Sequence, residues 1–261
     1  MERKPVVIDP EQFPASLRDI LTSATLYDSS CSPDARVWFI DRDEGFYLKT
    51  AKRGSLEKEA TLTAYFHQKG LSAEVIAYEQ AESDWLLTRT VPGEDCIFKP
   101  YLDDPKRLCD TTAQLLRQLH ETDCSNCPVP NCTAEYIAAV IENYRLEKWD
   151  KSLFPDNWGY RSAEEAWSVV QEFSGVLKAD TLLHGDYCLP NIILDNWKFS
   201  GFIDLGGGGV GDRHIDLFWG CWSLNFNLKT DAWCDRFLDV YGRDGFDQQI
   251  LSVIGAFEVF R

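Results

Sequence analysis

Basic residues are scarce in this sequence. It contains 26 lysines and arginines against 42 aspartates and glutamates, which gives a formal net charge of −16. Proteins that bind nucleic acid or anionic membranes need a basic face for the phosphates, so this composition disfavours both partners. A cationic substrate is favoured instead, because a cleft lined with charge of one sign concentrates the opposite charge. An acidic surface that only keeps the protein in solution is the simpler alternative.

Long apolar runs are also missing. No run approaches the length that spans a membrane, and residues 1–5 lack the apolar core of a signal peptide. We therefore expect a cytoplasmic protein whose nine cysteines, an odd number, are reduced. Cys124, Cys127 and Cys132 are close in the sequence and hint at zinc. No fourth ligand lies nearby except an awkwardly placed His120, so ordinary loop thiols are favoured.

The apolar pattern predicts strands mainly before residue 90 and helices mainly after residue 105. With 261 residues, 44% of them hydrophobic, the chain can form one large domain or two lobes. Alternating apolar residues predict strands, and apolar residues three and four apart predict helices. The predicted strands are 37–40, 45–49, 85–88, 192–195 and 199–203; the predicted helices are 14–23, 55–69, 106–120, 133–147, 162–173, 215–226, 231–241 and 248–260.

One stretch combines three side chains that can handle protons or metal ions. Asp186 and Asn191 lie five positions apart in a loop that Pro190 keeps from being helical. The strands 192–195 and 199–203 follow, and a hairpin of these strands would return Asp204 to the side of Asn191.

These three side chains fit one kind of chemistry. A carboxylate for a substrate hydroxyl, with an Asn and an Asp for magnesium, is the minimum equipment for phosphoryl transfer from a nucleotide. The alternative is that each residue only caps a turn. The pattern H-x-D-x-x-x-x-N followed by D-x-G at hairpin spacing is specific enough to favour phosphoryl transfer.

The motifs resemble those of the aminoglycoside phosphotransferases, which share the protein-kinase fold, and most of all the 3′-phosphotransferase branch, the kanamycin and neomycin kinases. The likeness runs from about Ser32 to the C-terminus and is carried by H-G-D at 184–186, C-L-P-N at 188–191, F-S-G-F-I-D at 199–204 and G-V-G-D-R at 209–213 with Asp216. It implies an α+β, bilobal fold with an N-terminal antiparallel β-sheet lobe containing one helix and a mainly α-helical C-terminal lobe. We expect a nucleotide-binding lobe at 1–91 and a catalytic, substrate-binding lobe at 92–261.

The resemblance assigns the central roles. Asp186 would be the catalytic base, and Asn191 and Asp204 would hold Mg²⁺. Lys49 would hold the α- and β-phosphates of ATP, and such a lysine needs a carboxylate to orient it. Alignment to the family selects Glu59 for this pair, whereas spacing alone leaves Glu57 open.

Further nucleotide contacts are implied in the N-terminal lobe. Ser32, in a loop of small residues, would touch the phosphates, although a turn-starting Ser-Pro is an equal alternative. Tyr47 lies two residues before Lys49 on the same strand face and would stack on adenine; its alternative is core packing. The main chains of Arg89 and Val91, at the link between the lobes, would meet the adenine edge.

The acceptor site is where the sequence departs from the family. The resemblance places Asp156, Asn157 and Glu258 against the amino sugar. The family's acidic C-terminal pair, its Arg after the magnesium Asp-x-Gly, and its polar helix positions are changed here, at Phe257, Arg261, Gly207, Trp222 and Phe226. We infer a more apolar substrate face.

The expected activity is transfer of the γ-phosphoryl group of ATP, with GTP left open, to a hydroxyl of a cationic aminoglycoside, the 3′-hydroxyl in the branch it resembles. The alternatives are a kinase of another small alcohol and a non-catalytic binding protein with a kinase fold. The protein is expected to be a monomer or a homodimer.

Overall fold

The computed structural model describes residues 4–154 and 158–261, and the chain forms two compact units. The first unit contains the residues up to Asp95 together with Ile192–Gly206, and the second contains Cys96–Asn191 and Gly207–Arg261. The hairpin that follows residues 184–191, here named the catalytic loop after its predicted role, is therefore part of the first unit. The functional division at residues 91 and 92 stays a prediction.

An antiparallel sheet forms most of the first unit, as the sequence predicted. Among the described residues its six strands follow the order β1-β2-β3-β4-β6-β5, and each pair of neighbours is antiparallel. The strands are β1 Lys4–Val6, β2 Thr25–Asp28, β3 Ala35–Asp41, β4 Phe46–Lys52, β5 Val75–Gln80 and β6 Ser83–Arg89.

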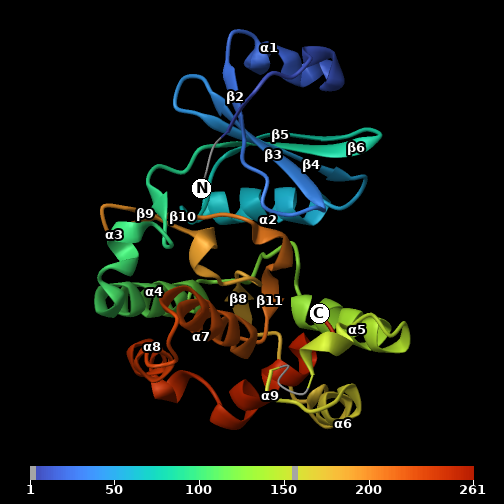
Figure 1. Ribbon diagram of the computed structural model, residues 1–261, viewed down its shortest axis with the longest axis vertical. Helices are drawn as coiled ribbons and strands as arrows, with labels where there is room; N and C mark the ends of the chain where they lie inside the picture. The colour runs from blue at the N-terminus through green and yellow to red at the C-terminus, as the bar shows by residue number, and fades with distance from the viewer. Residues whose placement is uncertain (1–3, 155–157) are drawn as a thin grey trace. The chain divides into compact units, whose positions relative to one another are not determined.

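The two faces of this sheet are covered differently. Along β4 the buried Phe46 and Leu48 alternate with Tyr47 and Lys49, so the two pairs face opposite sides of the sheet. Phe46 and Leu48 pack in an apolar cluster with three residues of the N-terminal region: Phe13, Leu17 of the 3₁₀ turn Ala15–Leu17, and Leu21 of α1, Arg18–Leu21. Another 3₁₀ turn spans Pro10–Gln12. The longer helix α2, Glu57–Gln68, runs beside the sheet in Figure 1, and Ala60 packs against Leu86 of β6.

The predicted hairpin after the catalytic loop is present. Strand β9, Ile192–Asp195, pairs with β10, Lys198–Phe202, and Ile192 lies opposite Phe202. The connecting residues Asn196 and Trp197 both have positive φ, 50° and 68°, which is the conformation of the tight turn that suits the twist of a hairpin. The short strand β7, Glu94–Asp95, pairs with the other edge of β9.

The second unit is mainly helical, which confirms the predicted α+β class. Its helices are α3 Lys99–Leu102, α4 Pro105–His120, α5 Cys132–Arg145, α6 Ala163–Phe173, α7 His214–Leu228, α8 Cys234–Tyr241 and α9 Gln248–Glu258. The side chains of Asp104, Asn131, Ser162 and Asp247 cap the N-termini of α4, α5, α6 and α9 by accepting a backbone N–H. Shorter 3₁₀ turns lie at Lys151–Leu153, Leu189–Asn191, Leu205–Gly207 and Arg243–Gly245.

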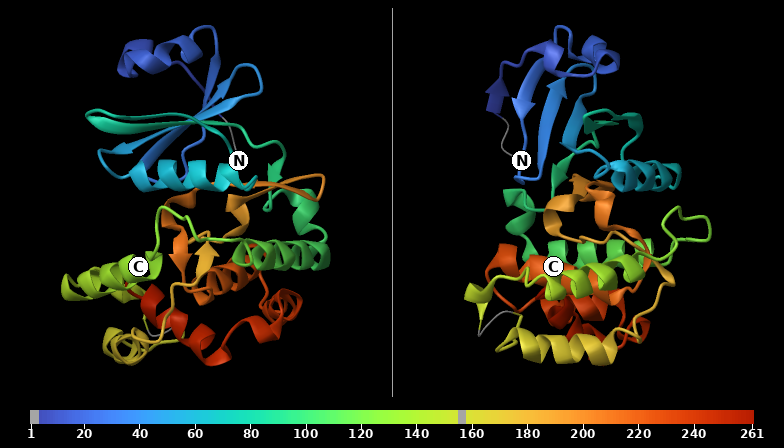
Figure 2. Two further views of the ribbon diagram at one scale, coloured as in Figure 1. Left: turned by 180° about the vertical axis from the view of Figure 1, so that it is seen from behind. Right: turned by 90° about the vertical axis from the view of Figure 1, so that its right-hand side faces the viewer.

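A two-stranded sheet lies among these helices. Strand β8, Thr181–Leu183, which leads into the catalytic loop, pairs with β11, Gly209–Gly211. Figure 2 shows this strand pair among the helices of the second unit. The apolar cluster beside it contains Leu183, Ile215 of α7 and the α9 residues Ile254 and Phe257.

Several elements differ from the sequence prediction. The predicted helix at 14–23 is α-helical only at Arg18–Leu21, because a 3₁₀ turn occupies Ala15–Leu17. The prediction did not include the short elements β1, β2, β5, β7, α3, β8 and β11. Most of them are two to four residues long, which is too short for apolar alternation to stand out.

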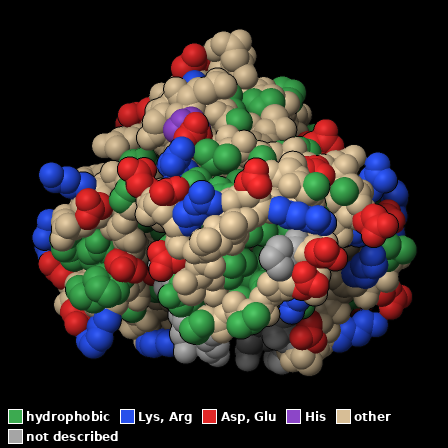
Figure 3. All heavy atoms as spheres, turned by 90° about the horizontal axis from the view of Figure 1, so that it is seen from above, with side chains coloured by type: hydrophobic (Ala, Val, Ile, Leu, Met, Phe, Trp, Pro, Cys, Tyr) green, Lys and Arg blue, Asp and Glu red, His purple; other side chains and the backbone are tan. Residues whose placement is uncertain are grey.

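Charged side chains of both signs are interspersed on the face of the molecule seen in Figure 3. This view displays no continuous basic stripe of the kind that follows a phosphate backbone among the residues that are described. Within residues 4–154 and 158–261, no helix combines the length and the apolar character needed to cross a membrane.

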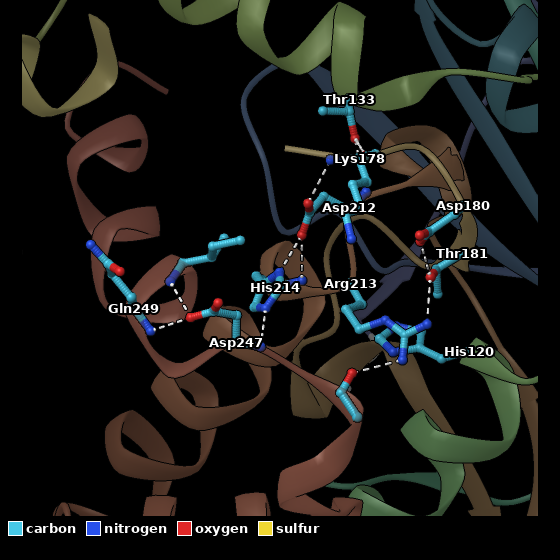
Figure 4. Close-up of polar contacts among 12 residues, drawn as sticks. His120, Thr133, Lys178, Asp180, Thr181, Asp212, Arg213, His214, Asp247 and Gln249 are labelled. Carbon is cyan, nitrogen blue, oxygen red and sulfur yellow. Dashed lines mark hydrogen bonds and ion pairs between the residues drawn. The ribbon is translucent and has the colours of Figure 1, made fainter. Parts of the chain in front are cut away.

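A buried carboxylate, Asp212, joins distant segments of the second unit (Figure 4). Asp212 is 2% exposed and accepts hydrogen bonds from the backbone N–H of Lys178 at 2.7 Å and of His214 at 3.0 Å, and from Nδ1 of His214. Its own N–H donates to Oγ1 of Thr133, which donates in turn to the carbonyl of Lys178. Nε2 of His214 accepts from the N–H of Asp247, the cap of α9.

These donors determine how Asp212 titrates. Burial raises the pKa of Asp212, but the hydrogen bonds from His214 and Lys178 lower it more, so the pKa lies below its usual value. A carboxyl whose folded pKa is depressed contributes stability above its unfolded pKa, about 3.9, and that contribution disappears as the pH falls through the folded pKa.

We therefore expect Asp212→Asn to lower the free energy of unfolding at pH 7 by about 1–3 kcal/mol, because one acceptor becomes a donor in a site built of donors. The difference from the wild type should shrink below pH 4. Urea unfolding between pH 3 and pH 7 measures both effects, with the exposed Asp195→Asn as control. A difference that does not depend on pH would contradict this role.

Candidate active site

The catalytic loop brings Asp186 and Asn191 together. Nδ2 of Asn191 donates to Oδ2 of Asp186 at 2.9 Å and to the Asp186 carbonyl at 3.0 Å. Asn191 is 9% exposed, whereas Asp186 is only half-buried and can be reached by a substrate. Since the amide nitrogen of Asn191 is used by Asp186, its oxygen is the atom that can serve as a ligand to a cation.

A second buried carboxylate, Asp216, holds the backbone at the start of this loop. Asp216 is fully buried, and its oxygens accept from the N–H of His184 at 2.7 Å and of Gly185 at 2.8 Å. Nε2 of His120 lies 3.3 Å from the same carboxylate, and Nδ1 of His120 lies 2.8 Å from the hydroxyl of Tyr241. His120 is therefore a buried core histidine with a partner at each ring nitrogen. Asp216 was among the residues that carry the family resemblance, but the sequence assigned it no function.

Helix α7 also supports the far end of the loop. The N–H of Leu189 donates to Oγ of Ser223 at 2.8 Å, and Ser223 is itself bonded to Nδ2 of Asn227 one turn further on. The hydroxyl of Tyr187 donates to the carbonyl of Thr112 in α4 at 2.7 Å. The loop is thus held at both ends, and α7 supplies a bond to each end.

The start of the loop needs a glycine. Gly185 has φ of +82°, and a Cβ built on it would lie 2.1 Å from the carbonyl carbon of Gly207. A Cβ on Gly207 would in turn lie 2.8 Å from the carbonyl oxygen of Gly185. Two backbones cross here without side chains between them, so a Cβ at either position would force the backbone to shift.

In the first unit, Lys49 lies between two carboxylates. Nζ of Lys49 is 2.7 Å from Oε2 of Glu59 and 2.6 Å from Oδ1 of Asp204. The structure thus pairs Lys49 with Glu59, which is 8% exposed, whereas Glu57 at the start of α2 is exposed. Asp204 has φ of 62°, a left-handed conformation that aspartate tolerates better than most residues.

The electrostatics of this group keep Lys49 charged. Burial lowers the pKa of Lys49, but Glu59 and Asp204 raise it more, so the ammonium group is protonated at neutral pH. Burial raises the pKa of Glu59, and so does the charge of Asp204, while Lys49 opposes both.

Ser32 and Tyr47, the other predicted nucleotide-binding side chains of the first unit, both contact neighbouring protein groups. Ser32 is exposed, and its Oγ accepts from the N–H of Asp34 at 3.1 Å, which is the turn-forming alternative. The ring of Tyr47 lies 5.3 Å from that of Phe39 on the neighbouring strand. Their contacts with a nucleotide stay predictions.

Arg89 and Val91 are the residues predicted to meet adenine at the link between the lobes, and the backbone N–H of Arg89 is already hydrogen-bonded within the protein. The N–H of Arg89 donates to the carbonyl of Glu74 at 2.9 Å, and its Nε donates to the Glu74 carboxylate at 3.0 Å. A contact of Arg89 with adenine would therefore use its carbonyl. The side chain of Val91 packs beside Gly201, where a Cβ would lie 3.1 Å from it.

The predicted acceptor residues are placed only in part. Asp156 and Asn157 lie outside the described residues. Glu258 is 5% exposed and accepts from the hydroxyl of Tyr136 at 2.7 Å. Burial raises the pKa of Glu258, and the charge of Asp186 contributes in the same direction. Phe257, where the family has an acid, is fully buried in the apolar cluster and stacks on Tyr136.

The possible zinc site received no support. In the described part of the chain, no group of three or more His, Cys, Asp or Glu side chains is arranged to hold a metal ion. Cys124 and Cys127 belong to one turn, in which the N–H of Cys127 donates to the carbonyl of Cys124.

The crossing of Gly185 and Gly207 gives a testable consequence. Gly185→Ala should lower the free energy of unfolding by about 3 kcal/mol or more, because the new methyl combines a left-handed φ with a backbone clash. Gly70→Ala is the matched control, since Gly70 has φ of +71° but nothing within 4 Å of its Cβ. The control should lose only about 1 kcal/mol. Equal losses in chemical denaturation would contradict the close approach.

Comparison with known proteins identifies the family of this chain. The model of a family described as "Phosphotransferase enzyme family" matches residues 25–250. A probable aminoglycoside 3′-phosphotransferase from Lactococcus lactis subsp. lactis is 49% identical over 258 residues, which cover 98% of this chain and 98% of that protein. An aminoglycoside 3′-phosphotransferase from Escherichia coli is 30% identical over 204 residues, 77% of this chain and 74% of its own.

Solved structures agree on the fold. An aminoglycoside phosphotransferase from Streptomyces rimosus superposes with a TM-score of 0.77 at 22% identity, covering 97% of this chain and 99% of that one. The same protein in complex with ADP and streptomycin has a TM-score of 0.71 at 21% identity, covering 86% and 90%. These likenesses confirm the predicted protein-kinase-like fold. From the family model and the Lactococcus relative, the chain belongs to the aminoglycoside phosphotransferase family of phosphotransferase enzymes.

Proposed function

We propose that the protein transfers the γ-phosphoryl group of ATP to a hydroxyl of an aminoglycoside, the 3′-hydroxyl in particular. The observation that carries this proposal is that two side chains needed for phosphoryl transfer are already oriented by their neighbours. Lys49 is held by Glu59 and Asp204, and Asp186 is held by Asn191. The 3′ position and the aminoglycoside class are supported by the names of the relatives from Lactococcus lactis and Escherichia coli.

In the proposed reaction, Lys49 binds the donor phosphates. Its ammonium group would exchange Asp204 for the α- and β-phosphates while Glu59 keeps it oriented. Asp204 would then be available, with the amide oxygen of Asn191, for Mg²⁺. A carboxylate and an amide oxygen are hard ligands that suit this ion, and bound Mg²⁺ would offset the charge of the phosphates. ADP in the Streptomyces rimosus structure supports a nucleotide donor.

Asp186 would act on the acceptor. Because Oδ2 accepts from Asn191, we assign Oδ1 to the substrate hydroxyl. The carboxylate orients this hydroxyl and takes its proton late, as the new bond to phosphorus forms. Positioning and electrostatic stabilisation account for most of the rate in such reactions, so the anchoring of the loop by Asp216 serves catalysis directly.

A second candidate is a kinase of a different small alcohol. The buried apolar side chain of Phe257 favours it, since the family has at this position an acid that can pair with an ammonium group. We further propose that the enzyme works in the cytoplasm, where ATP is abundant; GTP as donor and the oligomeric state stay open predictions.

ADP release with magnesium-ATP and a panel of kanamycin, neomycin, butirosin and lividomycin tests the proposal. We expect ADP release to depend on the aminoglycoside. Its rate should fall by about 10²–10⁴-fold in Asp186→Ala, because the base and its orientation are lost together. Asp195→Ala, which removes an exposed carboxylate elsewhere, should retain the activity. Slow ATP hydrolysis that no aminoglycoside stimulates would favour the second candidate.

A further inference from the structure

Three aromatic side chains of α7 form a continuous row, here named the aromatic ladder: Trp219, Trp222 and Phe226. The rings of Trp219 and Trp222 lie 5.2 Å apart at 82°, and those of Trp222 and Phe226 lie 4.9 Å apart at 15°. Phe226 is 54% exposed, although large aromatic side chains are usually buried. The ring of Trp158 lies 5.9 Å from that of Trp219 and 6.0 Å from that of Trp222, so both are partly buried and Phe226 is the end of the ladder that is open to solvent.

At its open end the ladder already holds a cation. Nζ of Lys229 lies 4.2 Å from the centroid of the Phe226 ring. This is within the range of a cation–π interaction, in which the negative ring face attracts an ammonium group. Lys229 ends α7 with a left-handed φ of 58° and is itself exposed, so it can leave the ring at little cost.

At its partly buried end the ladder meets a carboxylate. Trp219 forms a hydrogen bond with Glu258, which is 5% exposed and whose carboxylate also accepts from Tyr136. Burial raises the pKa of Glu258, and the charge of Asp186 adds to this in the same direction. This end of the ladder therefore carries an acidic group that attracts a cation.

The position of the ladder on α7 places it beside the catalytic loop. Residues four apart on a helix are surface neighbours, and Trp219 lies four residues before Ser223, which binds the N–H of Leu189. Asp216, three residues before Trp219, binds the start of the same loop. The ladder therefore lies on the face of α7 next to the one whose Asp216 and Ser223 hold the catalytic loop.

We propose that the aromatic ladder is a specificity-determining wall of the acceptor site and binds the ammonium-bearing face of a polycationic amino sugar. This inference rests on the proposed function and specifies its substrate class. Ring faces attract ammonium groups and pack against the C–H faces of sugar rings. The buried charge of Glu258 attracts an ammonium group toward the Trp219 end, and Lys229 leaves the Phe226 ring when the substrate binds.

Calorimetric titration of kanamycin B into Phe226→Leu and Trp222→Leu tests this role without requiring turnover. Each change keeps an apolar side chain but removes the ring face. Each should weaken binding by roughly 3- to 30-fold, the range of a partly desolvated cation–π contact. In turnover assays KM should rise by a similar factor while kcat stays within about 2-fold, because Asp186 and Lys49 are untouched. Phe98→Leu, which removes an exposed ring at the start of α3, is the matched control and should bind like the wild type.

A second probe separates ring recognition from hydrogen bonding. Tetramethylammonium has no donor hydrogen and binds through its charge to aromatic faces. It should compete with kanamycin B for the wild type and for Phe98→Leu, and its inhibition should weaken in Phe226→Leu.

The outcomes are distinct. Unchanged affinity in both ladder variants, or a fall in kcat with constant KM, overturns the inference. A shift from dimer to monomer in sedimentation of Phe226→Leu also overturns it, because the ladder would then join two copies of the chain. If kanamycin B binds through the ladder but is never phosphorylated, the proposed function is refuted, while the binding role of the ladder is supported. Absence of binding by the wild type refutes both.

Discussion

The geometry of the catalytic loop depends on one buried carboxylate, Asp216. A fully buried carboxylate is costly unless its oxygens are saturated with donors, and here the donors are two consecutive backbone N–H groups and a buried imidazole. The loop cannot relax away from Asp216 without leaving that charge unpaired. This constraint fixes the backbone next to Asp186, and Asn191 then fixes the Asp186 side chain.

Helix α7 connects this constraint to the acceptor. It provides Asp216 and Ser223 on one face to hold the loop and the aromatic ladder on the adjacent face. A change in the packing of this helix would therefore act on the catalytic geometry and on substrate recognition together. The separate Asp212 network fixes the beginning of the same helix through His214.

The sequence predicted the site residues best where they lie close together in one short motif. Asp186, Asn191 and Asp204 lie in one stretch, and the hairpin between the last two follows from two apolar runs and a tight turn. Spacing could not choose between Glu57 and Glu59, because both lie in the first turn of α2; burial on the sheet side decides for Glu59.

Long-range packing accounts for what the sequence did not reveal. The role of Asp216 depends on backbone groups about thirty residues earlier in the chain, and backbone donors leave no residue-specific signal. The family motif predicted that Glu258 meets the substrate, and only the structure shows that it is buried against Tyr136. The short strands β8 and β11 are defined by pairing across the second unit, because neither is long enough to show alternation.

The most direct test of the account is the site of phosphorylation, determined by mass spectrometry and ³¹P NMR of the product. Kanamycin B and tobramycin form a matched pair of acceptors, since tobramycin lacks only the 3′-hydroxyl. We predict that kanamycin B gains one phosphate, on the 3′-oxygen, in a reaction that requires Asp186. Tobramycin should gain none. A phosphate on another hydroxyl, or equal turnover of the two acceptors, would contradict it.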